Sequence, residues 1–361
     1  ILAAKSPVFI CGGGVINSGA EQILESIAEL LNIPVCTTVS GQGSLAGTHP
    51  LNAGVVGANG GVMATRDVVN AADLVFFITC RAGSTTTENW RFPNKSIPII
   101  HLDVDPETIG ANYPTAVGLV GDAKLSLEQL YRDLKANIQS RTTNCVDGKA
   151  VVAKAKAIKF ASFIQLANSN DTPILPEKIV HTLNKLLPKD AIVCADPGTP
   201  CPYFSAYFLS DIPGRHFITN RAHGALGFAM SAAIGAAIGQ PQSKCVAVMG
   251  DGSFGFTVGE LETITRYKLP ILMIVISNSV YGWIKASQKS GYDQRYYSVD
   301  FNRTNHAKVA EAYGVRSWTV DDPQKLESVI KAAIECGEPA LIDIISQPLQ
   351  DAAAPVSQWM G

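Results

Sequence analysis

The sequence predicts an α/β fold made of two doubly wound, parallel-sheet domains. Short apolar runs that are typical of buried strands alternate with helix-like runs, and this alternation occurs twice, with a polar stretch between the two blocks. The chain of 361 residues is also longer than one hydrophobic core usually organises. The two observations together indicate two α/β domains rather than one.

The first block is predicted to form a Rossmann-like central domain over residues 1–135. It opens with an apolar run at 7–11, and Gly12-Gly13-Gly14 and a helical pattern follow it. Further strand-like runs lie at 33–37, 73–79 and 97–103. The glycine triplet permits a tight turn, but its spacing is not GxGxxG and no hydride-transfer constellation follows. These features argue against a nicotinamide dehydrogenase.

Residues 136–172 have no strand signal and are predicted to be a partly helical linker. The alternation resumes in a second domain, predicted over residues 173–346. Its strand-like runs lie at 191–195, 244–249, 271–277 and 340–345, and its helix-like runs at 224–238, 258–267 and 324–333. The polar, Pro- and Ala-rich residues 347–361 are predicted to be a tail or lid.

Composition excludes several classes of partner. A formal net charge of −2 gives no electrostatic reason to expect nucleic acid or an anionic membrane. No apolar run reaches the roughly 18–20 residues that a membrane span needs. The eight cysteines are scattered, without a CxxC pair, which favours reduced thiols and a cytoplasmic location.

The most informative stretch is the apolar run 245–249 and the turn Gly250-Asp251-Gly252-Ser253 that ends it. Glycines allow a sharp turn at the carboxyl edge of the sheet, where open α/β sheets bind ligands. A right-handed crossover leads to the run 271–277, so Asn278 is predicted to lie beside Asp251. One carboxylate, one amide oxygen and backbone carbonyls suit Mg²⁺, and exposed turn amides suit phosphate. Gly-Asp-Gly alone is a common turn, so the prediction depends on both strand ends.

Together with Asn278, this turn resembles the cofactor motif of the thiamine-diphosphate (ThDP) dependent superfamily of acetolactate synthase, pyruvate oxidase and 2-oxo acid decarboxylase type. The resemblance implies Mg²⁺ bound by Asp251, Asn278 and the carbonyl of Val280. The superfamily usually has two consecutive asparagines; here Ser277 precedes Asn278, which matches the metal-binding one. The cofactor-binding residues that the motif implies are Gly250, Gly252, Ser253, Tyr281, Gly282 and Trp283.

Two further segments resemble the same superfamily. Asp196-Pro197-Gly198-Thr199-Pro200 is similar to its first phosphate-side loop, which implies that Gly198, Thr199 and Pro200 bind the cofactor. His223-Gly224-Ala225-Leu226-Gly227 is similar to the segment under the aminopyrimidine ring. This implies contacts from Gly224, Ala225 and Leu226, with the Leu226 side chain wedged between the cofactor rings. His223 is a candidate catalytic acid–base residue, and a structural histidine is the competing interpretation.

The first block resembles the central domain of that superfamily in Gly12-Gly13-Gly14 and in the segments 33–38, 54–60 and 101–106. In some members this domain binds FAD or ADP, and in others it is empty, so a nucleotide there stays open. Members also carry an N-terminal pyrimidine-binding domain that supplies a glutamate to the cofactor. The resemblance therefore implies that this chain is a fragment or a subunit, with a pyrimidine-binding domain as its partner. It also implies a homo- or hetero-oligomer of at least two-fold symmetry.

The implied reaction is cleavage or formation of a C–C bond next to a carbonyl group, on a small 2-oxo acid, aldehyde or acyl-CoA substrate. Ser287 stands where acetolactate synthases typically carry Trp, which favours a decarboxylase, carboligase or lyase. An acetolactate-synthase-like transferase is the alternative. A non-catalytic nucleotide-sensing module is the alternative from another class, against which the intact Asp251 and Asn278 argue. His306 is predicted to lie on a helix surface.

Overall fold

The computed structural model describes residues 1–221 and 223–356. The chain divides into two compact units. Unit 1 consists of residues 1–161, 209–215 and 356, and unit 2 of residues 162–208, 216–221 and 223–355, within the described ranges. Each unit contains one six-stranded sheet, and all strand pairs in both sheets are parallel. The predicted fold class, two doubly wound α/β domains, is confirmed.

The sheet of unit 1 has the strand order β3-β2-β1-β4-β5-β6, the doubly wound order of Rossmann folds. Its strands are β1 (Pro7–Cys11), β2 (Val35–Thr37), β3 (Asn52–Val55), β4 (Leu74–Ile78), β5 (Ile99–Asp103) and β6 (Val117–Val120). Its helices are α1 (Gly14–Asn17), α2 (Glu21–Leu31), α3 (Met63–Asn70), α4 (Ser84–Thr87) and α5 (Ala123–Ala136). Short 3₁₀ turns lie at Val39–Gly41 and Ile138–Ser140.

Residues of β1 alternate between the two cores of unit 1. Phe9 packs with Leu24 and Ile27 of α2 on one face, and Ile10 packs with Val68 of α3 on the other. A parallel sheet covered by helices on both faces must be apolar on both, which explains the continuous apolar run of β1. Helix α6 (Gly148–Ala167) makes up much of the stretch that was predicted to be a partly helical linker. The division between the two units falls after Ala161, within this helix.

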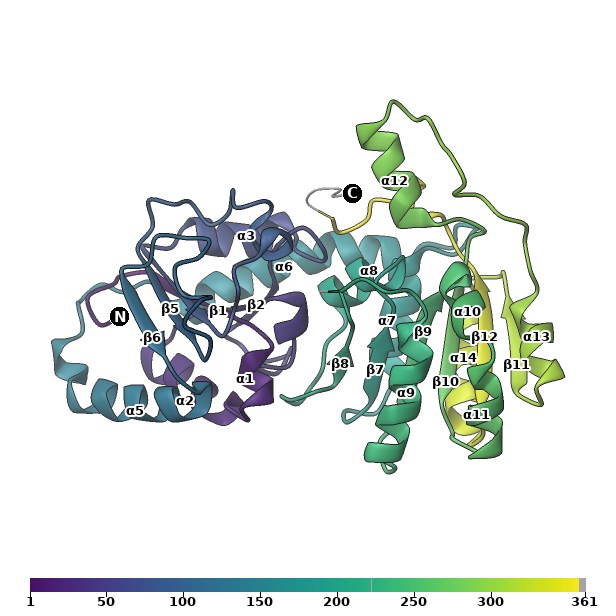
Figure 1. The fold of residues 1–361 in the computed structure, drawn as a ribbon, viewed down its shortest axis with the longest axis horizontal. Helices are drawn as coiled ribbons and strands as arrows, with labels where there is room; N and C mark the ends of the chain where they lie inside the picture. The colour runs from purple at the N-terminus through teal and green to yellow at the C-terminus, as the bar shows by residue number, and fades with distance from the viewer. Residues whose placement is uncertain (222, 357–361) are drawn as a thin grey trace. The chain divides into compact units, whose positions relative to one another are not determined.

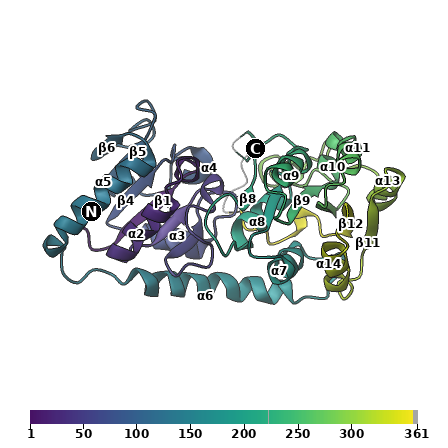
Figure 2. The ribbon, with the colours of Figure 1, turned by 90° about the horizontal axis from the view of Figure 1, so that it is seen from below.

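The sheet of unit 2 has the strand order β11-β12-β10-β9-β7-β8. Its strands are β7 (Ile192–Ala195), β8 (Phe217–Ile218), β9 (Cys245–Gly250), β10 (Leu272–Ser277), β11 (Arg316–Val320) and β12 (Ala340–Ile345). Its helices are α7 (Pro176–Leu186), α8 (Pro200–Tyr207), α9 (Phe228–Gly239), α10 (Asp251–Thr257), α11 (Glu260–Arg266), α12 (Gly282–Gly291), α13 (His306–Ala312) and α14 (Leu326–Glu335). Helices α9, α10 and α11 lie over one face of the sheet, and α7 and α14 lie over the other (Figures 1 and 2).

The strand order places a topological switch point between β7 and β9. After β7 the chain continues to the edge strand β8, whereas after β9 it continues to β10 on the opposite side. Connections that leave a sheet in opposite directions open a crevice at its carboxyl edge. The loop after β7 and the turn after β9 therefore border the crevice in which an open α/β sheet binds its ligand.

Several boundaries differ from those predicted. The helix predicted from residue 224 begins at Phe228, because Gly224 and Gly227 have left-handed φ values of 83° and 86°. Of the predicted tail, residues 347–356 are described and contain a 3₁₀ turn at Leu349–Asp351, and residues 357–361 lie outside the described part. None of the helices in residues 1–221 and 223–356 has both the length and the apolar character of a bilayer span.

Candidate functional site

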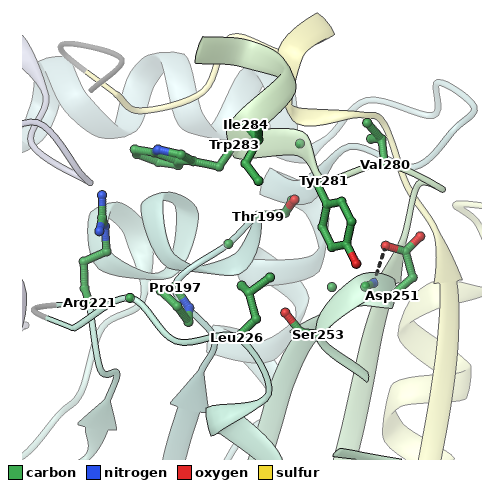
Figure 3. Close-up of a pocket in the computed structure, with 15 residues that line it drawn as sticks. Pro197, Thr199, Arg221, Leu226, Asp251, Ser253, Val280, Tyr281, Trp283 and Ile284 are labelled. Carbon is green, nitrogen blue, oxygen red and sulfur yellow. Dashed lines mark hydrogen bonds between the residues drawn. The ribbon is translucent and has the colours of Figure 1, made fainter. Parts of the chain in front are cut away.

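A cavity of about 260 Å³ lies in unit 2 at the switch point (Figure 3). Three segments form its wall: the loop after β7, the turn before α9, and the carboxyl ends of β9 and β10 with the starts of α10 and α12. The described residues that line it are Pro197, Gly198, Thr199, Arg221, Gly224, Leu226, Gly250, Asp251, Gly252, Ser253, Val280, Tyr281, Gly282, Trp283 and Ile284. The sequence motifs, which are far apart along the chain, thus meet in one cavity.

Asp251 joins the ends of β9 and β10. One carboxylate oxygen, Oδ2, accepts hydrogen bonds from the backbone N–H groups of Asn278 (2.8 Å) and Ser279 (2.6 Å). The other, Oδ1, accepts from the N–H of Gly252 at 2.9 Å. The side chain is only 5% exposed; this burial raises the pKa of Asp251, and the three N–H donors oppose the rise. The carboxylate that would bind a metal is therefore also the group that holds the two strand ends together.

Asn278 has an unsatisfied side chain. Its amide oxygen Oδ1 and nitrogen Nδ2 are both buried, and neither has a hydrogen-bond partner among the described residues. An unpaired buried amide group costs about 1–3 kcal/mol, so such a group indicates that a ligand completes the site. A carboxylate from Asp251, the amide oxygen of Asn278 and the carbonyl of Val280 are all hard oxygen donors, which is the ligand chemistry that Mg²⁺ prefers. The residues present fit this metal.

Two glycines of the site occupy places where a side chain does not fit. A Cβ atom on Gly252 would lie 2.5 Å from Cε1 of Tyr281, and one on Gly282 would lie 2.8 Å from Cβ of Leu349. Both glycines line the cavity together with the hydroxyl-bearing residues Thr199 and Ser253. Without side chains, the glycines leave room for close contacts along the cavity wall. The backbone of the glycines and the nearby hydroxyl groups border a space that suits a phosphate group.

Leu226 projects into the cavity between the loop after β7 and the turn after β9 (Figure 3). It lies in a turn bounded by the left-handed residues Gly224 and Gly227. A Cβ on Gly198 would lie 3.5 Å from Cδ2 of Leu226, so the leucine reaches across to the loop after β7. Its position is that of an apolar wedge on the cavity floor.

Asp196 fixes the loop after β7 to the helix that follows the turn. Its Oδ1 accepts a hydrogen bond from the backbone N–H of Phe228, the first residue of α9, at 2.9 Å. The residue is fully buried, and this burial raises the pKa of Asp196 to about 7 despite the N–H donors at the start of α9. Among the described residues its Oδ2 has no partner. Asp196 thus connects two walls of the cavity, the loop after β7 and the turn before α9.

Behind the end of β10, three buried side chains form a network. The hydroxyl of Ser277 donates to Asp343 of β12 and contacts Nδ1 of His306 at 3.0 Å. Asp343 also accepts from the backbone N–H of His306 at 3.0 Å. The prediction that His306 lies on a helix surface is wrong: it is only 6% exposed, because it opens α13 against Asp343 and packs its ring edge-on to Phe254.

Most of the predicted cofactor residues line the cavity, and some do not. Asn278, Pro200 and Ala225 are not among the lining residues. The amide of Asn278 is buried, Pro200 is the first residue of α8, and Ala225 is exposed, with its carbonyl accepting from Asn220. His223 is exposed and is not among the described lining residues, so its catalytic role stays a prediction. Sequence reasoning assigned no role to Pro197, Arg221 or Ile284, which also line the cavity. Pro197 and Ile284 flank recognised motifs, but Arg221 is an isolated loop charge without a sequence signal.

In unit 1, packing accounts for the glycine triplet after β1. A Cβ on Gly12 would lie 2.0 Å from the carbonyl oxygen of Thr79, and one on Gly14 would lie 2.5 Å from Cβ of Thr79. A Cβ on Gly13 would lie 3.0 Å from the carbonyl oxygen of Ser40. These contacts require small residues whether or not a nucleotide binds, and FAD or ADP in this unit stays a prediction.

Comparison with known proteins connects both units to one family. Residues 1–130 match the model of the thiamine pyrophosphate enzyme central domain, and residues 196–344 match that of the thiamine pyrophosphate enzyme C-terminal TPP binding domain. The chain is 34% identical over 357 residues to the probable acetolactate synthase large subunit of Methanococcus aeolicus, covering 96% of this chain and 59% of the relative. It is 30% identical over 337 residues to the acetolactate synthase isozyme 3 large subunit of Escherichia coli, covering 93% and 58%. The chain therefore spans less than two thirds of the length of these relatives.

Proposed function

The chain belongs to the thiamine pyrophosphate enzyme family, and from this membership we propose that unit 2 binds the diphosphate of ThDP together with Mg²⁺. The observation that carries the proposal is at the ends of β9 and β10, where the Asp251 carboxylate accepts from the backbone N–H of Asn278 and the side-chain amide of Asn278 has no partner among the described residues. Hard oxygen donors beside a glycine-lined space would suit a metal ion and a phosphate group. ThDP, when bound, supplies the carbon nucleophile that attacks a substrate carbonyl group.

Each predicted residue has a proposed task. Asp251, Asn278 and the carbonyl of Val280 would bind Mg²⁺, and Leu226 would place an apolar side chain against the cofactor. The residues proposed to surround the cofactor are Gly198, Thr199, Pro200, Gly224, Ala225, Gly250, Gly252, Ser253, Tyr281, Gly282 and Trp283. Asp196 and the Ser277–His306–Asp343 network hold the strand ends in place rather than contact the cofactor.

For the whole protein we propose a ThDP-dependent carboligase of the acetolactate-synthase type, which joins small 2-oxo acids. The names of the relatives support this class. Ser287, where acetolactate synthases typically carry Trp, keeps a decarboxylase or lyase as the second candidate. The proposed assembly pairs this chain with a pyrimidine-binding domain that supplies the catalytic glutamate, in an oligomer of at least two-fold symmetry. We propose residues 1–135 and 173–346 as the two domains.

Isothermal titration calorimetry of the full-length protein with ThDP, in Mg²⁺ and in EDTA, tests the cofactor proposal. The unaltered protein should bind ThDP only with the metal, and Asp251→Ala should lower this affinity at least about 100-fold, because a charged metal ligand is lost. Asp321→Ala, which removes an exposed carboxylate, is the control. Unchanged affinity in Asp251→Ala, with a normal melting curve, would refute the assignment of this site.

A further inference from the structure

We propose that His306 is a positioning residue for the metal site, because it contacts both segments that carry the proposed metal ligands. This inference rests on the proposed function. Nδ1 of His306 lies 3.0 Å from the hydroxyl of Ser277, which immediately precedes Asn278. The His306 ring packs edge-on against Phe254, with ring centroids 5.3 Å apart and an interplanar angle of 85°. Phe254 lies three residues after Asp251 in α10, on the same side of that helix. One ring therefore touches the neighbours of both ligands.

Hydrogen bonds fix the orientation of the His306 ring. An ionised carboxylate only accepts, so the Ser277 hydroxyl gives its proton to Asp343, and its oxygen is left to accept from Nδ1 of His306. Nδ1 also lies 3.3 Å from Asp343 Oδ1, and the backbone N–H of His306 donates to Asp343 Oδ2. Nδ1 therefore carries the proton. The backbone and the ring of His306 are held by the same buried carboxylate.

The three residues do not form a nucleophilic triad. In such a triad the histidine contacts the serine through one ring nitrogen and the carboxylate through the other. Here Nδ1 of His306 faces both Ser277 and Asp343. Ser277 is also only 4% exposed, and none of the three is among the described residues that line the cavity. The arrangement suits a structural support of the neighbouring site rather than attack on a substrate.

The proposed ligands depend on this support. The Asn278 amide has no hydrogen-bond partner among the described residues, so the backbone at the end of β10 determines where the amide lies. Asp251 Oδ2 accepts from the backbone N–H groups of Asn278 and Ser279 at 2.8 and 2.6 Å. A shift of either segment therefore changes the position of the carboxylate relative to the amide. Mg²⁺ needs a nearly ideal octahedron of oxygens, whereas Ca²⁺ tolerates an irregular one. Loss of positioning should consequently weaken Mg²⁺ binding more than Ca²⁺ binding.

Calorimetry of ThDP binding in Mg²⁺ and in Ca²⁺ tests this difference. His306→Ala should lower the ThDP affinity measured in Mg²⁺ about 10- to 100-fold, the range for residues that support metal ligands. The affinity measured in Ca²⁺ should fall less than about three-fold. Ile330→Ala is the control, because it creates a cavity at a fully buried site in α14 and lowers stability without altering the network. It should leave both affinities within about two-fold of those of the unaltered protein.

Two substitutions separate ring packing from hydrogen bonding. His306→Phe keeps a ring against Phe254 but has no N–H for Ser277, and His306→Asn keeps a side-chain N–H but no ring. Each should recover part of the Mg²⁺-dependent affinity that His306→Ala loses. An equal loss in Mg²⁺ and Ca²⁺, or a loss that Ile330→Ala shares, would overturn the inference and leave His306 with a role in stability alone. Unchanged affinity in all three His306 variants would also overturn it.

Hydrogen exchange of the protein without metal or ThDP tests His306 independently of the proposed function. In His306→Ala the backbone N–H groups of Asn278 and Ser279, which donate to Asp251, should exchange about 10-fold faster or more, and residues 272–276 should be unchanged. Ile330→Ala should accelerate exchange across unit 2 instead. Equal protection of Asn278 and Ser279 in His306→Ala and the unaltered protein would overturn the inference. Failure of the unaltered protein to bind ThDP in either metal would refute the proposed function, whatever the exchange rates.

Discussion

Replacing Gly252 by alanine tests whether the Tyr281 ring forms a fixed wall of the cofactor site. Gly252 is the second residue of α10, and a Cβ at this position would lie 2.5 Å from Cε1 of Tyr281. Carbon atoms in contact are about 3.5–4.0 Å apart, so the ring must move by about 1 Å or more. Tyr281 packs against Phe301 with ring centroids 5.1 Å apart, and its backbone N–H donates to Val299. Gly252→Ala should therefore displace the ring.

The magnitude follows from two opposing effects. Overpacking of this size costs about 1–3 kcal/mol, whereas alanine in place of glycine within a helix contributes about 1 kcal/mol. The free energy of unfolding should therefore fall by no more than about 2 kcal/mol. If the displaced ring enters the site, the cofactor must push it back to bind. The steric cost of about 1–3 kcal/mol then reduces the free energy of binding, and ThDP affinity should fall about 5- to 150-fold.

Gly255→Ala provides the matched control. Gly255 lies in the same helix, and a Cβ there would have no neighbour within 4 Å. This variant should gain about 1 kcal/mol of stability and bind ThDP normally. Urea unfolding measures the stability of both variants, and calorimetry in Mg²⁺ measures their ThDP affinity. If Gly252→Ala matches Gly255→Ala in both measurements, the Tyr281 ring is free to move and the argument from close contact is wrong.

Two more predictions concern buried carboxyl groups of unit 2. Glu177 is 2% exposed, and burial raises its pKa from the ordinary 4.5 to about 7, so the folded state holds a proton that the unfolded state releases. The free energy of unfolding should therefore fall by up to about 3 kcal/mol between pH 5 and pH 8. Urea titrations should show a smaller fall in Glu177→Gln, whereas the exposed control Glu338→Gln should fall as much as the unaltered protein. Asp343→Ala removes the acceptor of the His306 backbone N–H and one acceptor of the Ser277 hydroxyl. Urea unfolding should therefore show a loss of about 3 kcal/mol in Asp343→Ala and almost none in the exposed control Asp321→Ala, and an equal effect in both would contradict the network.

The strands that the sequence predicts are those buried on both faces. Runs such as those of β1, β4, β9 and β10 are continuous and apolar, because helices cover both sides of a parallel sheet. The strands missed are short or exposed. All four residues of the edge strand β6 are exposed, β8 has two residues, and β3 contains Asn52 and Gly54. Their pairing depends on the neighbouring strand, a tertiary contact that leaves little trace in local sequence.

The site was predictable where backbone shape restricts the residue type. Glycines at sharp turns and polar residues at strand ends leave a local pattern, which predicts the turn at Asp251 and Gly252, whereas Gly282 was predicted from the family resemblance. Arg221 and His306 leave no such pattern, because their surroundings come from distant segments. The guanidinium carbon of Arg221 lies 4.9 Å from the centroid of the Trp283 ring, and Asp343 of β12 accepts from the backbone N–H of His306. A histidine at a helix start is usually solvated, so local sequence favours the wrong interpretation of His306, and it gives no signal for Arg221.

Some buried polar groups of unit 2 have hydrogen-bond partners, and others have none among the described residues. The Ser277–His306–Asp343 network is bonded internally, and its members are buried among strand and helix ends. The Asn278 amide, next to Ser277, and the Arg221 Nε are buried without partners among the described residues. Each unpaired buried polar group lowers the stability of the fold by about 1–3 kcal/mol. Selection for stability alone would pair these groups or replace them with apolar ones. The unsatisfied amide of Asn278, beside the carboxylate of Asp251, therefore supports the proposed metal site at the ends of β9 and β10.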